Sequence, residues 1–180
     1  MKRIRTKRLI IEPVDIGLVE KISAQTNDNA ADHFLNSLSD EEVKVVLSDM
    51  EVVKNILMEM EYKRASPDVR AVGAWYGENI VGYVTILRCI DDIPEIQIEI
   101  LGAYQHRGFG FELLFNLLKE IFVTEQTKYF RYVAVPTNKA SIALVEKLGA
   151  ELQTPKSEAE KILFKTYWIK REHFLEKVER

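Results

Sequence analysis

Six residues just past the middle of the chain have the types and spacing of an anion-binding turn: Gln105, His106, Arg107, Gly108, Phe109 and Gly110. The glycines allow a tight turn and let a ligand approach the backbone without an intervening Cβ atom. Apolar residues then recur at helical spacing over residues 109–123, which predicts a helix that begins at the turn. The first amides of a helix lack partners within it, and with the helix dipole they suit a pyrophosphate group. Arg107 adds positive charge to such a site unless its side chain faces solvent.

Three other interpretations of this turn can be tested against the residues present. An ordinary connection from a strand to a helix, which needs glycine for its geometry alone, stays open. A dinucleotide-binding fingerprint fits poorly, because Leu113 stands where the third glycine of that fingerprint belongs. A P-loop is excluded, because no Gly-Lys-Ser/Thr sequence follows the glycines.

A segment with two carboxylates precedes the turn. Polar and apolar residues alternate strictly over residues 95–100, which predicts a half-buried strand. The period of two places Glu95, Gln97 and Glu99 on one face and three isoleucines on the other. A carboxylate on such a face can act as a general base, although a solvated polar face explains the same pattern.

The remaining elements must position the turn and this strand. Alternating or β-branched runs predict strands over residues 8–14, 68–76, 80–89, 95–100, 129–135 and 161–169. Apolar residues at helical spacing predict helices over residues 16–23, 43–62, 109–123 and 141–148, and Ser39, with carboxylates in the turn after it, predicts the start of the second. The polar stretch 25–36 predicts a loop with room for a helical turn. The strands first form a hairpin meander and later alternate with helices, so we expect one mixed α/β sheet in a single domain over residues 1–180.

Composition and charge exclude several classes of protein. The 180 residues are 47% hydrophobic and 29% charged, with a net charge of −3, so we expect no nucleic-acid partner. The apolar runs are too short to span a bilayer, and the basic N-terminus leads into no apolar secretory segment, so we expect no membrane partner. The single cysteine, Cys89, rules out an internal disulfide and fits a reducing, cytoplasmic location. Metal-ligand spacing is missing from the three histidines, so we expect no metal site.

Segments on both sides of the turn resemble the GNAT superfamily of acetyltransferases. The superfamily signature Gln/Arg-x-x-Gly-x-Gly/Ala is met by Gln105, Gly108 and Gly110. Downstream, the superfamily's Asn-x-x-Ser/Ala, Glu-Lys-x-Gly segment is similar to Asn138, Ser141 and the run Glu146-Lys147-Leu148-Gly149.

Upstream, residues 6–13 resemble the opening of the branch that includes the ribosomal-protein N-terminal acetyltransferases, and Glu112 also suits that branch. The resemblance implies a central mixed, mostly antiparallel, twisted sheet with splayed central strands flanked by helices. It also implies an N-acetyltransferase that uses acetyl-coenzyme A (acetyl-CoA) as co-substrate and binds it between the splayed strands.

Carried over by position, the resemblance implies a set of coenzyme contacts. The amides of residues 105–110 would hold the pyrophosphate. Asn138 and Ser141 would lie near the pantetheine or the thioester, although Asn138 can also cap the helix that follows it. The pantetheine arm would meet main-chain groups of Ile98, Glu99 and Ile100.

The implied reaction is acyl transfer to an amine, which must lose a proton before it attacks. Superfamily members often carry a base on the strand before the turn, so we expect Glu95 or Glu99 to be the base, directly or through water, with Glu95 slightly preferred. Many members also have a tyrosine general acid seven residues after the asparagine, where this chain has Val145. The thiolate then leaves unassisted, or Ser141 or water donates the proton.

The acceptor and a second function stay open. A small-molecule amine, a peptide or protein N-terminus and a lysine side chain are all candidate acceptors, and the branch resemblance weakly favours a protein N-terminus. The aromatic residues Trp75, Tyr76 and Tyr83 line an acceptor pocket or pack in the core. Val145 keeps a non-catalytic acyl-CoA-binding sensor or interaction module in consideration, and the chain is expected to be a monomer or a homodimer.

Overall fold

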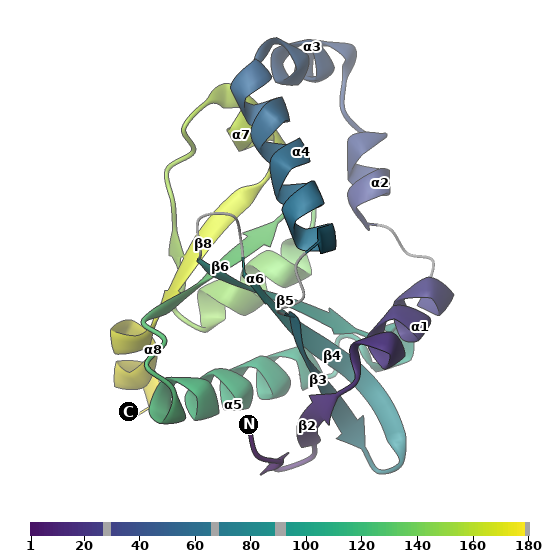
Figure 1. Ribbon diagram of the computed structural model, residues 1–180, viewed down its shortest axis with the longest axis vertical. Helices are drawn as coiled ribbons and strands as arrows, with labels where there is room; N and C mark the ends of the chain where they lie inside the picture. Colours follow the sequence, from purple (N-terminus) through teal and green to yellow (C-terminus); the bar gives the residue numbers. More distant parts are fainter. Residues whose placement is uncertain (27–29, 66–68, 89–92, 179–180) are drawn as a thin grey trace.

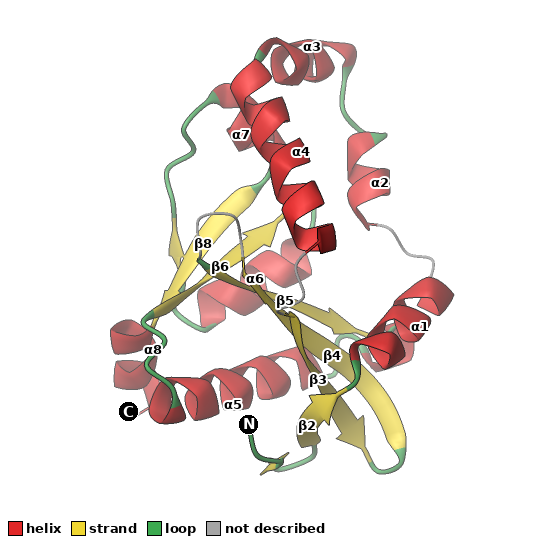
Figure 2. Ribbon diagram, viewed as in Figure 1, coloured by secondary structure: helices red, strands yellow, loops and turns green. Residues whose placement is uncertain are grey.

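The computed structural model describes residues 1–26, 30–65, 69–88 and 93–178, which form an eight-stranded sheet flanked by helices (Figure 1, Figure 2). The strand order is β1-β2-β3-β4-β5-β6-β8-β7, and neighbouring strands are antiparallel except β5 and β6, which are parallel. The predicted mixed, mostly antiparallel sheet is therefore confirmed. The strands are β1 (Ile4–Arg5), β2 (Ile10–Val14), β3 (Val69–Tyr76), β4 (Asn79–Arg88), β5 (Pro94–Ile100), β6 (Tyr129–Ala134), β7 (Glu151–Leu152) and β8 (Lys165–Lys170).

The helices divide between the two faces of the sheet and a group at one end of the molecule. The helices are α1 (Ile16–Thr26), α2 (Ala30–Leu35), α3 (Asp40–Ser48), α4 (Met50–Ala65), the 3-10 turn η1 (Gly102–Tyr104), α5 (Phe109–Thr124), α6 (Lys139–Lys147), α7 (Glu158–Leu163) and α8 (Arg171–Val178). The main core forms where α5, α6 and α8 pack on one face of the sheet. Helix α1 packs on the other face through Val19, which lies in a smaller cluster with Ala71 and Tyr83. Helices α3, α4 and α7 lie together at the top of Figure 1. No helix within the described ranges has both the length and the apolar character needed to cross a bilayer.

Helix α5 is the centre of the main core, because its apolar residues recur at helical spacing. Seven of its side chains are buried, among them Leu113, Leu117 and Phe122. Phe122 also lies 5.5 Å, between ring centroids, from Phe174 of α8, which the sequence did not predict as a helix. The predicted helix over residues 109–123 is therefore confirmed.

The prediction of one helix over residues 43–62 is wrong, because the chain breaks at Asp49 into α3 and α4. Asp49 has φ −91° and ψ 79°, outside the helical region. Its side-chain oxygen accepts a hydrogen bond from the Val52 amide at 3.1 Å, as a residue that caps a new helix does. The helix start predicted at Ser39 is confirmed, with Ser39 and Glu42 forming a capping box.

Two further expectations need correction. The stretch 25–36, predicted as a loop with room for one helical turn, contains the end of α1 and the whole of α2 (Ala30–Leu35), and residues 27–29 lie outside the described residues. The strand predicted over residues 161–169 begins only at Lys165, since Ser157 accepts a hydrogen bond from the Glu160 amide at 3.2 Å and starts α7. Cys89, at the end of the second predicted hairpin strand, lies outside the described residues.

Candidate active site

The centre of the sheet is split between β5 and β6. Among the described residues these parallel strands pair at one position, Glu95 with Arg131, at the start of β5. The same two residues form an ion pair, with Arg131 Nε 3.1 Å from Glu95 Oε2. Beyond this point the strands separate, so the carboxyl end of β5 has an open edge in the middle of the sheet. The predicted splay of the central strands is thus present.

Gly82 of β4 lets β5 lie against β4 where β5 separates from β6. A Cβ atom at Gly82 would lie 2.3 Å from the Glu99 carbonyl oxygen and 2.7 Å from Ile100 Cδ1. Any side chain there would push the end of β5 away from β4, toward β6. A glycine at this position therefore keeps the splay open.

The ladder between β4 and β5 sets which main-chain groups face the splay. The Leu101 amide donates to the Val81 carbonyl at 3.0 Å, so these two residues form a hydrogen-bonded pair. Because such pairs recur at every second residue of an antiparallel ladder, the main-chain groups of Glu99 point toward β4. Those of Ile98 and Ile100 point the other way, into the splay.

The glycine turn adopts a backbone shape that the sequence indicated only in part. The Gln105 side-chain amide donates to the Ile100 carbonyl at 2.9 Å, which ties the turn to the end of β5. Gly108 has φ 78°, a left-handed conformation that favours glycine. His106 has φ 58°, and histidine is among the non-glycine residues that tolerate this region. The side chains of His106 and Arg107 are exposed.

Helix α5 starts at Phe109 with its first amides uncapped. Gly108 occupies the capping position, and no side chain of the described residues caps it. The first-turn amides therefore lack intrahelical partners and can bind an anion. Gly110 differs from Gly108, because neither its backbone conformation nor its surroundings demand glycine. A Cβ atom there would lie 3.4 Å from Ile100 and 3.7 Å from Leu144, which are ordinary packing distances.

The two candidate bases have different environments, although both lie on the face that α1 covers. Glu95 is only 3% exposed, and its two oxygens accept hydrogen bonds from Gln97 Nε2 at 2.9 Å and from Arg131 Nε at 3.1 Å. Arg131 also reaches Glu59 of α4, at 3.2 Å. Glu95 thus lies in a buried ion network that joins β5, β6 and α4.

Glu99 is more accessible than Glu95 and contacts a tyrosine. It is half-buried, and its carboxylate accepts a hydrogen bond from the Tyr83 hydroxyl. Burial and this hydrogen bond raise the pKa of Tyr83 from its ordinary value of 10 to about 12. The phenol therefore stays protonated at neutral pH and keeps donating to Glu99.

A hydroxyl pair lies at the start of α6. Asn138 caps this helix by accepting a hydrogen bond from the Ser141 amide at 3.0 Å, so its structural role is confirmed. The Ser141 hydroxyl lies 2.5 Å from the hydroxyl of Tyr132 in β6. Burial raises the pKa of Tyr132, although its hydrogen bond with Ser141 acts in the opposite direction. Val145, one turn further along α6, is fully buried in the main core.

Sequence reasoning did not single out Arg131, Tyr132 or Arg8, which all contact candidate site residues. Arg131 had a signal, since it is a charged residue in an otherwise apolar strand. Tyr132 had none, and Arg8 had only its place in the segment 6–13 whose resemblance is described above, because their partners are brought close only by the fold. No group of three metal-ligating side chains occurs in the described parts of the chain. A cavity of about 640 Å³ lies away from the turn, between Arg70, Pro94 and Lys128.

Comparison with known proteins identifies the family. Residues 8–151 match the family described as "Acetyltransferase (GNAT) domain". No curated protein sequence matches the chain.

Solved structures share the fold at low sequence identity. The ribosomal L7/L12 alpha-N-protein acetyltransferase RimL, in complex with coenzyme A, is 16% identical, with 93% of this chain and 97% of that chain covered and a TM-score of 0.60. The spermidine N-acetyltransferase from Vibrio cholerae, in complex with CoA and spermine, is 15% identical, with 94% and 99% covered and a TM-score of 0.62. An acetyltransferase from Salmonella typhimurium that modifies the N-terminal serine of ribosomal protein L7/L12 is 17% identical, with 93% and 98% covered and a TM-score of 0.59. At such identities the likeness shows the fold alone.

Proposed function

The chain belongs to the GNAT acetyltransferase family, and we propose that it transfers an acetyl group from acetyl-CoA to a primary amine by direct attack in a ternary complex. One observation carries the proposal. The open edge of β5 leads directly to an uncapped helix start at Gly108. One ligand can therefore pair an extended arm with β5 and bind its anionic group at the helix start. Two of the structurally similar acetyltransferases are complexes with coenzyme A, which supports the same ligand here.

The coenzyme would follow the splay from the turn inward. The pyrophosphate would bind the amides of residues 105–110, including His106, Arg107 and Phe109. The pantetheine arm would pair with the main-chain groups of Ile98 and Ile100, because these face the splay. Glu99 would then contribute its side chain rather than its main chain, and Asn138 and Ser141 would lie near the thioester.

The base in this proposal is Glu99 rather than Glu95. An attacking amine is mostly protonated at neutral pH, so a carboxylate or a relayed water must take a proton from it. Glu95 is buried with both oxygens engaged, and a proton added there would weaken the ion pair with Arg131. Glu99 is half-buried on the same face, where an amine or a water can reach it.

The leaving thiolate would receive its proton from Ser141. Many relatives use a tyrosine at the position of Val145, but a side chain at this position points into the core. Ser141 lies within hydrogen-bond distance of Tyr132, so the serine can give its proton to sulfur while it takes one from the phenol, and the phenolate then regains a proton from water. Thiols have pKa values of about 8–9, so little assistance is needed. Holding the reactants together supplies most of the acceleration.

The acceptor proposed here is a cationic primary amine on a small molecule or at a peptide or protein N-terminus. The face opposite the main core presents Glu99 and Tyr83 next to the splay, and α4 adds Glu59 beside Arg131. Negative charge on this face favours an amine over an anionic acceptor. The similar structures include one enzyme that acts on a protein N-terminal serine and one on spermidine, so both kinds of acceptor are supported.

A second candidate is a non-catalytic acyl-CoA-binding module, favoured by Val145 alone. This candidate requires saturable coenzyme binding without release of thiol for any amine. Turnover of one amine at a useful rate would eliminate it.

The test measures coenzyme binding and turnover with a matched pair of glycine variants. CoA at a hundred times its Kd should stabilise the folded protein by about 2.7 kcal/mol, seen as a higher melting temperature. Gly108→Ala should weaken CoA binding, while Gly77→Ala, which loses a glycine at a similar φ of 62° in the β3–β4 turn, should not. Acetyl-CoA with polyamines or N-terminal peptides should release thiol. If CoA does not raise the melting temperature of the wild-type protein, the proposal is wrong.

A further inference from the structure

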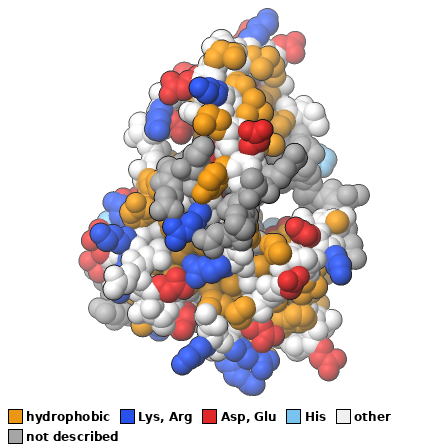
Figure 3. Space-filling model, viewed as in Figure 1, with side chains coloured by type: hydrophobic (Ala, Val, Ile, Leu, Met, Phe, Trp, Pro, Cys, Tyr) orange, Lys and Arg blue, Asp and Glu red, His pale blue; other side chains and the backbone are white. Residues whose placement is uncertain are grey.

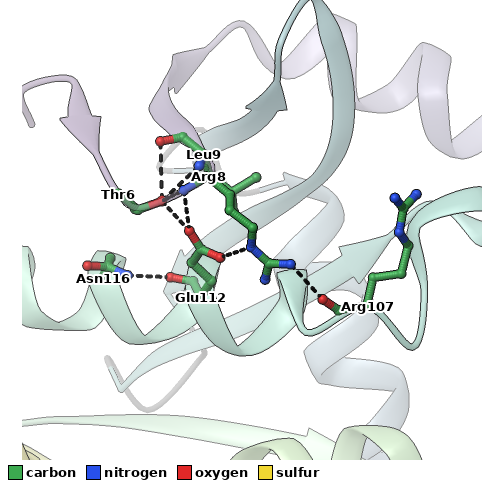
Figure 4. A network of polar contacts seen from close by, with 6 residues as sticks. All are labelled: Thr6, Arg8, Leu9, Arg107, Glu112 and Asn116. Carbon is green, nitrogen blue, oxygen red and sulfur yellow. Dashed lines mark hydrogen bonds and ion pairs between the residues drawn. The ribbon is translucent and has the colours of Figure 1, made fainter.

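We propose that Arg8 is a positioning residue that holds the turn over residues 105–110 in its coenzyme-binding shape, with Glu112 holding Arg8 in place. This inference rests on the proposed function, because it concerns the turn at which the pyrophosphate would bind. It connects the segment before β2, at the start of the chain, with a turn near residue 108 (Figure 4).

Glu112 of α5 holds the N-terminal segment through three hydrogen bonds. Its Oε1 accepts from the Thr6 hydroxyl at 2.5 Å and from the Arg8 amide at 2.8 Å. Its Oε2 accepts from Arg8 Nε at 2.7 Å. The Glu112 side chain is 13% exposed and the Arg8 side chain 37%, so the carboxylate is largely buried while the guanidinium that binds it is partly open to water. Figure 4 shows the carboxylate between Thr6 and the Arg8 guanidinium.

Arg8 extends from Glu112 to three consecutive residues of the turn. Its Nη1 donates to the Arg107 carbonyl at 2.9 Å. Its Nη2 lies 3.5 Å from the point where a Cβ atom of Gly108 would be. Its guanidinium carbon lies 4.4 Å from the centre of the Phe109 ring, a cation–π distance. One side chain thus bonds to the residue before the capping glycine, lies next to that glycine and packs on the first residue of α5.

The bond to the Arg107 carbonyl fixes the direction of the next amide. A trans peptide group is planar, so its C=O and the following N–H point in opposite directions. With the Arg107 carbonyl directed at Arg8, the Gly108 N–H must point away from Arg8. This orientation is present before any ligand binds, and a preformed site loses less freedom on binding.

The ion pair also limits the charge that Glu112 presents to a bound phosphate. Although burial alone would raise it, the hydrogen bonds from Thr6 and Arg8 lower the pKa of Glu112 from its ordinary value of 4.5. The stabilisation from a lowered pKa is present above that ordinary value and is lost as the pH falls through the folded-state value. At neutral pH the carboxylate is therefore charged, and the Arg8 guanidinium balances it next to the turn.

The experiment compares binding of CoA with binding of pantetheine, which lacks the phosphates. Arg8→Ala should raise the Kd for CoA about tenfold, the effect of one charged hydrogen bond, and leave the Kd for pantetheine unchanged. In turnover, KM for acetyl-CoA should rise while kcat changes little. Arg8→Lys should rescue only part of the affinity, because lysine cannot bond to Glu112 and to the Arg107 carbonyl as a planar fork does.

The matched control is Arg3→Ala, which removes an exposed arginine that pairs with Glu12 at 3.1 Å in the same N-terminal segment. It should bind CoA as the wild-type protein does. Glu112→Gln serves as a second variant if Arg8→Ala folds poorly, and it should lose CoA affinity in the same selective way. Unchanged CoA affinity in the Arg8 and Glu112 variants, or equal losses for CoA and pantetheine, would overturn the inference. Failure of the wild-type protein to bind CoA would instead remove the proposed function.

Discussion

At the scale of single residues, the two carboxylates of β5 share a face but not an environment. Glu95 is held in the ion network with Arg131 at the position where β5 and β6 pair. Glu99, four residues further, lies beside the splay with Tyr83. The sequence pattern could not distinguish them, because Arg131 and Tyr83 come from other strands.

We expect Glu99→Gln to lower kcat about a hundredfold, since a positioned general base contributes at least that much. Thiol release at saturating acetyl-CoA measures this kcat. Glu95→Gln should instead lower the free energy of unfolding by about 2 kcal/mol and leave kcat nearly unchanged, because it weakens a buried ion pair. A large loss of kcat in a folded Glu95→Gln protein, with kcat retained in Glu99→Gln, would reverse the assignment.

Ser141 and Tyr132 should act as one unit in proton donation. We expect Ser141→Ala to lower kcat about tenfold or more, with KM nearly unchanged, and Tyr132→Phe to have a smaller effect. In a double-mutant cycle the second substitution should add little to Ser141→Ala, because Tyr132 acts through the serine. Full activity of Ser141→Ala would show that the thiolate leaves without its help.

The sequence was most informative where a residue type performs its role locally. Gly108 needs its left-handed conformation and Asn138 caps its own helix, and both roles follow from a few neighbouring residues. Arg8 and Tyr132 could not be predicted in the same way. Arg8 meets Glu112 across about a hundred positions, and nothing nearby in the sequence marks either one as the other's partner.

At the scale of elements, predictions were confirmed where a regular pattern runs through the element and were wrong where one side chain or a distant strand decides the structure. The helix over residues 109–123 was predicted because its apolar face is long and regular. The break at Asp49 was missed because apolar spacing continues across it, while a single side-chain cap decides the geometry. The short strands β1 and β7 are too short for a periodic signal, and each forms only by pairing with another strand.

The separation of β5 from β6 should depend on Gly82. We expect Gly82→Ala to lower the free energy of unfolding by about 1–3 kcal/mol, because the new Cβ meets backbone at 2.3 Å, and to weaken CoA binding by pushing β5 toward β6. Gly73→Ala in β3 is the control for CoA affinity, since its Cβ would meet a side chain, Val14 Cγ1 at 2.9 Å, rather than the backbone of β5. Calorimetric titration with CoA and urea unfolding measure both effects. Unaltered CoA affinity in a folded Gly82→Ala protein contradicts this role.

At the scale of the whole molecule, the sheet with α5 forms a well-packed body, and α3 and α4 lie at one end with little burial. Helix α3 has no buried residue, whereas α5 has seven. Exposed apolar side chains gather over these helices in the upper part of Figure 3. The exposed apolar side chains of α3 and α4 include Leu47, Met50, Leu57 and Met60.

We expect backbone amides of α3 and α4 to exchange with solvent deuterium much faster than those of α5. Local opening needs less free energy where few apolar contacts are lost. Hydrogen exchange followed by mass spectrometry, with and without CoA, measures this, and CoA should slow exchange at the start of α5 more than in α3. Equal protection of α3 and α5 without ligand would contradict the expectation.

Within the described residues, β5 and β6 pair at one position, which divides the sheet into two antiparallel halves, β1 to β5 and β6 to β7. Each half therefore has an edge strand at the centre of the sheet, β5 or β6, in addition to its outer edge at β1 or β7. Exposed edges of this kind usually invite aggregation. We expect the gap between β5 and β6 to suit an extended molecule with amide groups of its own, which would complete the hydrogen bonding of the sheet as a substitute strand.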